Sequence, residues 1–209
     1  MGKDIITKLR EIEEKAKPLV DERIAQFKKL GEFGTEEELF SELSFCVLTA
    51  NWSAGRGIKA QELLGINNFV NLTKEELEKE LLKVGHRFAR ARSNFIVENR
   101  KLIGKIREII SLPTHEGRKY LVKNAKGIGW KEASHFLRNT GNLQVAILDK
   151  HILRTLWEEG LIPEIPKGWT EKRYLEIEKI FFDLSYRFGK EPGETDLYIW
   201  YLIKGKVEK

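Results

Sequence analysis

Cysteine is almost absent from this chain: its 209 residues include one, Cys46. A disulfide within the chain needs a pair of cysteines, and a cysteine-ligated zinc or iron–sulfur site needs more, so the sequence excludes all of these. No apolar run approaches the roughly 20 residues that a membrane helix requires, and the first residues lack the apolar core of a secretion signal. These absences predict a cytoplasmic protein with no metal cluster and no membrane contact.

The rest of the composition suits a folded protein with an acidic partner. Hydrophobic residues make up 41% of the chain, which is enough to build a core, and the formal net charge is +5. A basic balance favours nucleic acid as the partner. Charge alone does not decide the matter, because many basic proteins bind no DNA.

Helical periodicity runs through almost the whole chain. Thr35 and Thr73 each open a capping box with the glutamate that follows three residues later, whereas Pro18 and Gly31 predict helix ends. No strand pair and no internal repeat is evident, so the predicted fold is all-α. The expected helices cover residues 5–16, 19–30, 36–50, 74–84, 88–110, 150–159, 170–188 and 194–203, with a further pair on either side of 125–129 and an extended link at 145–148.

The most informative segment is the one from Leu121 to Ala133, which predicts a helix, a tight glycine hairpin and a second helix. Gly127 and Gly129 permit positive-φ turns that a Cβ would obstruct, and Ile128 between them is expected to pack beneath the turn. The hairpin should expose free amide N–H groups where the dipole of the second helix adds partial positive charge. We expect a DNA phosphate there, bound without reading of the base sequence; the alternative is an ordinary turn with a glycine C-cap.

Lys131 lies just after this hairpin, and Asp149 begins a later helix. This arrangement resembles the helix-hairpin-helix superfamily of DNA glycosylases. The resemblance implies that Lys131 attacks C1′ of a damaged nucleotide, forms a Schiff base and nicks the strand by β-elimination, while Asp149 stabilises positive charge on the sugar. Lys131 is expected on the first turn of a helix, where the dipole disfavours a cation, and partial burial should also favour its neutral amine. The alternatives are a phosphate-contacting lysine and an aspartate that serves as an N-cap, a role compatible with catalysis.

A short all-α chain with this hairpin and no cluster cysteines also resembles the archaeal-type 8-oxoguanine DNA glycosylase/lyases, the second Ogg family. The resemblance covers most of the chain. It implies that Phe88 and Trp200 sandwich a flipped purine, and that the chain ends at Lys209 with its terminal carboxylate in the base pocket. The residues alone favour a core role for Trp200 and a frayed, solvated tail at Lys209.

Other residues are candidates for contact with DNA outside the base pocket. By resemblance, Asn51 fills the gap left by the flipped base and faces the opposite cytosine, although an Asn C-cap explains this residue equally well. Arg87 either holds a phosphate or the estranged cytosine, or lies on a solvated basic face; for His151, core packing competes with a backbone contact. The complete set of candidate DNA contacts is Asn51, Arg87, Lys126, Gly127, Gly129 and His151.

The resemblance predicts two helical lobes that flank a DNA-binding cleft. Residues 31–142 form one lobe, which ends in the hairpin, and residues 1–30 join 143–209 to form the other. The predicted activity is removal of 8-oxoguanine from double-stranded DNA, opposite cytosine, followed by strand nicking. The enzyme is expected to be a prokaryotic monomer that uses no metal and no organic cofactor. Two alternatives stay open: the same chemistry on oxidised pyrimidines, and a non-catalytic hairpin module that clamps phosphates.

Overall fold

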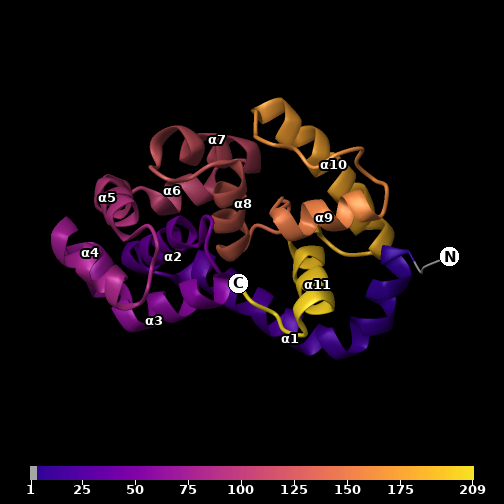
Figure 1. The fold of residues 1–209 in the computed structure, drawn as a ribbon, viewed down its shortest axis with the longest axis horizontal. Helices are drawn as coiled ribbons and strands as arrows, with labels where there is room; N and C mark the ends of the chain where they lie inside the picture. Colours follow the sequence, from indigo (N-terminus) through magenta and orange to yellow (C-terminus); the bar gives the residue numbers. More distant parts are fainter. Residues whose placement is uncertain (1–3) are drawn as a thin grey trace.

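The computed structural model describes residues 4–209, so the first three residues of the predicted second lobe lie outside it. Within this range the chain is helical and contains no strand, which confirms the predicted all-α fold (Figure 1). The helices are α1 (Ile5–Phe33), α2 (Glu36–Thr49), α3 (Ala54–Asn71), α4 (Lys74–Lys83), α5 (Ala89–Asn99), the 3-10 turn η1 (Arg100–Leu102), α6 (Ile106–Ser111), α7 (Thr114–Asn124), α8 (Trp130–Asn139), α9 (Lys150–Glu158), α10 (Glu171–Phe188) and α11 (Pro192–Lys204).

The helices gather into two groups. Figure 1 shows α2 to α8 on one side and α9 to α11 on the other, with α1 along the lower edge. Each group has its own buried apolar cluster: one draws mainly on residues 39–137, and the other mainly on residues 5–27 and 143–199. The second cluster therefore joins segments from both ends of the chain.

Helix α1 is longer than its sequence predicts. It runs unbroken through Pro18 and Gly31, both of which were expected to end helices. Pro18 is exposed, while Ala16 and Val20 are fully buried on the opposite side. The proline ring therefore faces water, and the packing of α1 outweighs the cost of one missing backbone hydrogen bond. Gly31 permits close packing instead: an added Cβ would lie 1.9 Å from the carbonyl oxygen of Thr140.

The single helix expected over residues 88–110 is wrong; the structure divides it into α5, η1 and α6. The break depends on a carboxylate from a distant part of the chain. Glu36 accepts the backbone N–H groups of Gly104 at 2.8 Å, Ile106 at 3.0 Å and Arg107 at 2.8 Å. This side chain therefore caps a new helix start, which local periodicity could not reveal.

Helix α3 has no counterpart among the predicted helices, because glycines interrupt its pattern. Gly65 bends it with a φ of +70°, and Gly57 lets it approach α2 so closely that an added Cβ would lie 2.5 Å from Thr49 Cγ2.

Across residues 4–209, no helix combines the length and the apolar character needed to cross a bilayer.

Candidate active site

The hairpin between α7 and α8 is present, but the predicted positive φ occurs only at Gly127, because Gly129 is the extended N-cap of α8 with a φ of −95°. Gly127 adopts a φ of +74°, and an added Cβ there would lie 2.6 Å from Phe95 Cδ2. Ile128 is buried beneath the turn, with 5% of its surface exposed. Asn99 braces the loop from α5: its Oδ1 accepts the Lys126 N–H at 2.7 Å, and its Nδ2 donates to the Lys126 carbonyl at 2.9 Å. Two residues of α5, Phe95 and Asn99, thus contact the turn.

A groove of about 470 Å³ lies beside the turn, lined by Lys101 and residues 122–129. The prediction of free amide groups is wrong at two positions: the Lys126 N–H donates to Asn99, and the Gly129 N–H donates to Glu132 Oε2 at 3.1 Å. Glu132 is the third residue of α8 and completes a capping box, so an internal carboxylate already occupies this part of the anion site.

Lys131 is held by the same carboxylate group. Its Nζ lies 3.0 Å from Glu132 Oε1, and its side chain is 20% exposed. This ion pair between neighbouring residues of α8 was not anticipated from the sequence.

Asp149 is an N-cap, as predicted. Its Oδ1 accepts the N–H groups of His151 at 2.8 Å and Ile152 at 2.9 Å at the start of α9. Both bonds use Oδ1, so capping does not engage Oδ2. The extended link that leads to Asp149 is also as predicted, and Tyr174 holds it by donating from Oη to the Ala146 carbonyl at 2.7 Å.

A pocket of about 220 Å³ brings five predicted residues together: Lys131, Asp149, His151, Trp200 and Lys209. They come from α8, α9, α11 and the C-terminal tail. The rings of His151 and Trp200 meet edge to face with centroids 5.0 Å apart, and burial lowers the pKa of His151. The volume falls below the roughly 300–1,000 Å³ of sites for drug-sized ligands, so it suits one base or sugar better than a whole nucleotide.

Three buried ionisable residues of this pocket escaped the sequence analysis: His135, Arg138 and Asp196. Arg138 donates from Nη1 to Asp196 Oδ2 at 3.0 Å. Neither Asp196 Oδ1 nor His135 Nε2 has a hydrogen-bond partner among the described residues. Burial raises the pKa of Asp196 to about 7 against the opposing effect of Arg138, and it lowers the pKa of His135 well below its usual range. The sequence did offer one signal: His135 and Arg138 are polar residues next to the apolar Phe136 and Leu137 of α8.

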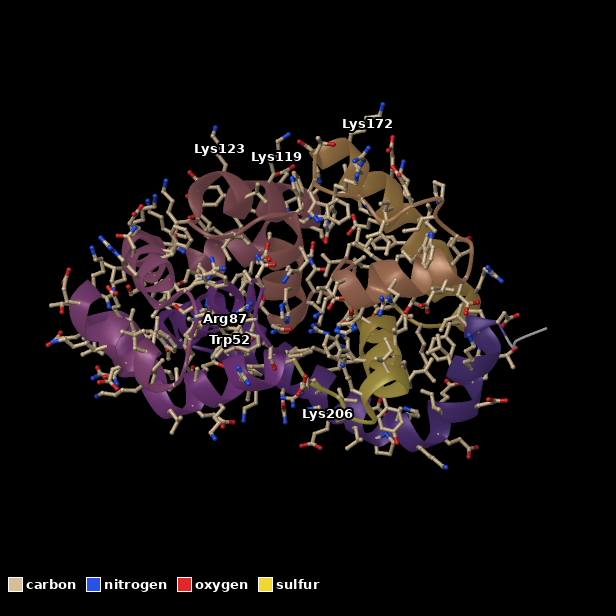
Figure 2. All side chains as sticks on the ribbon, viewed as in Figure 1. Trp52, Arg87, Lys119, Lys123, Lys172 and Lys206 are labelled. Atoms are coloured by element: carbon tan, nitrogen blue, oxygen red, sulfur yellow. The ribbon has the colours of Figure 1, made fainter. Side chains whose placement is uncertain are left out.

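Phe88 does not lie in this pocket. It is 41% exposed and lines a separate hollow with Arg87 and residues 89–91. Trp52 connects the two places, because it lines the pocket and lies 4.2 Å from the ring of His86, which in turn lies 6.4 Å from the ring of Phe88. Figure 2 shows Trp52 and Arg87 close together near the middle of the molecule.

His86 is buried, with 2% of its surface exposed, and its ring connects α2 to Phe88 through two hydrogen bonds. One ring nitrogen, Nε2, lies 2.9 Å from the Leu48 carbonyl, and Nδ1 lies 3.1 Å from the Phe88 N–H. A carbonyl can only accept and an N–H can only donate, so the ring must be neutral with its proton on Nε2. Burial agrees with this form because it lowers the pKa of His86.

The exposed Asn51 follows the C-cap of α2 with a φ of +60°, the left-handed conformation of a residue that ends a helix. Its carbonyl accepts a hydrogen bond from Arg87 Nη2 at 3.0 Å, and the Ala50 carbonyl accepts one from Arg92 Nη2 at 2.8 Å. Both arginines thus fasten the end of α2. The structure therefore separates the predicted residues into the pocket, the Asn51–Phe88 region and the hairpin groove.

Comparison with known proteins accords with this geometry. The family model described as 8-oxoguanine DNA glycosylase matches residues 20–190. An 8-oxoguanine DNA glycosylase/AP lyase of Thermotoga petrophila is 58% identical over 206 residues, 99% of each chain. The crystal structure of the 8-oxoguanine DNA glycosylase of Thermotoga maritima superposes with a TM-score of 0.97 at 58% identity, covering 98% of each chain.

A third relative was solved with DNA. The Methanocaldococcus jannaschii 8-oxoguanine glycosylase/lyase, in complex with a 15mer DNA containing 8-oxoguanine, has a TM-score of 0.94 at 45% identity and covers 98% of this chain and 99% of its own. The match to the family model, the full-length identity and the shared fold all point the same way. This chain belongs to the 8-oxoguanine DNA glycosylase family.

Proposed function

We propose that this protein excises 8-oxoguanine from double-stranded DNA and then nicks the strand as an AP lyase. The observation that carries the proposal is the convergence of Lys131 and Asp149 on one base-sized pocket in a chain of this family. The relatives with full-length similarity are named for both activities, and a relative of the same fold was solved with DNA containing 8-oxoguanine.

Lys131 supplies the nucleophile. Its deprotonated amine attacks C1′ of the nucleotide, the bond from C1′ to the base breaks, and the base leaves with the bonding electron pair and takes up a proton. Opening of the sugar gives a Schiff base between the amine and C1′, and loss of a proton from C2′ then expels the 3′ phosphate. The pocket needs no further group to supply this nucleophile.

Asp149 acts through its charge. As the base departs, positive charge develops on the sugar, and a carboxylate in the same pocket stabilises it. The cap uses Oδ1, which fixes the orientation of the side chain and directs the role in catalysis to Oδ2.

Recognition of the base falls to Trp200, Lys209 and Phe88. Trp200 and Lys209 line the pocket, which supports their assignment. Phe88 is exposed in a neighbouring hollow, so a sandwich of the purine requires that the base and Phe88 come together as DNA binds. Stacking on such aromatic faces contributes about 1–3 kcal/mol per base.

The remaining contacts hold the DNA. The Gly127 amide and the Lys126 side chain bind a backbone phosphate at the hairpin groove, where Gly129 forms part of the lining. His151 contacts the DNA backbone at the pocket. Asn51 enters the gap that the flipped base leaves, with Arg87 beside the opposite cytosine. Left-handed backbone geometry and exposure at Asn51 support this assignment.

The cleft lies between a lobe of residues 31–142 and a lobe of residues 1–30 and 143–209, in a protein that acts as a monomer. The separate buried clusters of the helix groups support this division, and the hairpin lies at the end of the first lobe.

Borohydride trapping tests the proposal directly, because it captures a Schiff base on DNA. A duplex with 8-oxoguanine opposite cytosine should yield a covalent adduct, and an undamaged duplex should not. Lys131→Gln should abolish trapping and nicking while it preserves binding. Lys150→Gln is the matched control, since it removes a neighbouring lysine charge and should keep the adduct.

The other outcomes separate the alternatives. An adduct on a plain abasic site but none on 8-oxoguanine would reassign the lesion to another base, such as an oxidised pyrimidine. No adduct on either duplex would leave a DNA-binding module. An adduct that persists in Lys131→Gln would move the nucleophile elsewhere.

A further inference from the structure

The C-terminal tail passes from one helix group to the other. It leaves α11 at Gly205 and ends beside α2 and α3, at the junction seen in Figure 1. Glu208 lies against the first turn of α3, where an added Cβ on Gly55 would approach its Oε1 to 2.8 Å. Lys206, labelled in Figure 2, lies on the same segment and forms an ion pair with Glu208, so it too belongs to the contact between the tail and α3.

The side chain of Lys209 fills a prepared socket in the first group. Its Nζ donates to Glu42 Oε2 at 2.6 Å, forms a second, short hydrogen bond to Gln61 Oε1, and lies 4.4 Å from the centre of the Phe45 ring. An anion, an amide oxygen and an aromatic face thus surround one ammonium group.

Glu42 is the centre of this socket. Its side chain is 4% exposed, and its other oxygen accepts Asn139 Nδ2 at 2.6 Å. Asn139 belongs to α8, the helix that carries Lys131, so one buried carboxylate connects the tail to the helix of the nucleophile. Among the ion pairs of residues 4–209, Lys209 is the cation that compensates this carboxylate, and a buried charge without its partner is strongly unfavourable.

The backbone of the same residue lies at the pocket. Lys209 lines it together with Lys131 and Trp200, and its main chain interacts with the buried ring of His135. The side chain is therefore bound in the socket while the backbone forms part of the wall of the base site.

We propose that Glu42, assisted by Gln61 and Phe45, is a positioning residue that holds the tail at the base pocket through the Lys209 side chain. This inference rests on the proposed function, in which Lys209 contacts the damaged base. Glu42 itself acts on the base only through Lys209. We call this set of contacts between Glu42, Gln61, Phe45 and the Lys209 side chain the clamp. Loss of the clamp should slow excision, which needs the base in place. It should leave nicking of an abasic site, where no base remains, largely unchanged.

The test compares Glu42→Gln, Lys209→Met and the double variant with wild type. Single-turnover excision of 8-oxoguanine and nicking of an abasic duplex are measured alongside thermal melting. Each single variant should lower excision by about tenfold or more and change abasic nicking by less than about twofold. The double variant should resemble the single ones, because all three remove the same interaction. Lys59→Met is the matched control, since it removes an exposed lysine charge from α3, the helix that carries Gln61, and should leave both rates near wild type.

Other outcomes overturn the clamp. Parallel loss of excision and nicking with a lowered melting temperature would make Glu42 merely structural. Unchanged excision in Lys209→Met, which retains the core and so is expected to fold, would show that the socket does not position the tail. If the two single losses of excision rate added up in the double variant, Glu42 and Lys209 would act independently of each other. Failure of the proposed function is distinct, because wild type itself would then excise no 8-oxoguanine.

Discussion

Replacement of Glu178 by glutamine should destabilise the protein severely. Glu178 and Arg118 form a bidentate pair at 2.5 and 2.8 Å, with side chains 6% and 3% exposed. Glu178 Oε1 also accepts the Ala146 N–H at 3.1 Å, in the link that leads to Asp149. The substitution leaves the guanidinium buried without its counterion.

Removal of one partner of a buried pair costs about 3–5 kcal/mol. For a chain of this size each kcal/mol lowers the melting temperature by roughly 2–4 °C, so Glu178→Gln should melt roughly 6–20 °C below wild type. Calorimetry and denaturant titration measure the loss. The double variant Arg118→Met with Glu178→Leu should recover much of it, because no unpaired charge remains.

The exposed pair Lys17–Asp21 is the control. Its atoms are as close, at 2.5 Å, but both side chains are more than half exposed, so Asp21→Asn should leave the melting temperature nearly unchanged. A loss below about 1 kcal/mol for Glu178→Gln would refute the reasoning, since it would mean that water reaches the guanidinium and screens its charge.

The remaining predictions concern the hairpin and His86. Gly127→Ala should weaken DNA binding, because it combines the roughly 1–2 kcal/mol cost of left-handed backbone with a clash against Phe95. Gly160→Ala is the control: Gly160 has a φ of +69° and open space around it, so this variant carries the backbone cost alone. Equal DNA binding by the two variants would contradict the clash. Burial lowers the pKa of folded His86, so its contribution to stability is complete above the unfolded pKa near 6.5 and is lost as pH falls toward the folded pKa, by up to about 1.4 kcal/mol per pH unit. Denaturant titrations from pH 7 to pH 5 should show a shallower decline for His86→Gln, and parallel curves would exclude a buried neutral ring.

The parts of the structure predicted correctly are those governed by local rules. The all-α class, the caps at Thr35, Thr73 and Asp149 and the turn at Gly127 depend on residues within a few positions of one another. The errors occur where distant groups intervene. Glu36 caps α6 from far along the chain, and the packing of α1 overrides Pro18.

The candidate site divides in the same way. The hairpin spacing singled out Lys131 and Asp149, and the structure places both on one pocket. The sequence could not show that Glu132 pairs with Lys131. Nor could it show that Asp196 and His135 are buried at the same pocket, each with a polar atom that has no hydrogen-bond partner in residues 4–209. A polar residue on an apolar helix face has no local partner, so only the packed structure shows which group it meets.

By itself, the sequence determined the helical class, the glycine hairpin, the pair Lys131 and Asp149 and, through their resemblance, the family of DNA glycosylases. These are encoded in propensities and short spacings, which act before the chain is compact. The tertiary structure alone decided that Phe88 and Trp200 occupy separate hollows and that the side chain of Lys209 is held by Glu42. Such contacts join residues far apart in the chain, and they exist only when folding has removed water and brought the helices together.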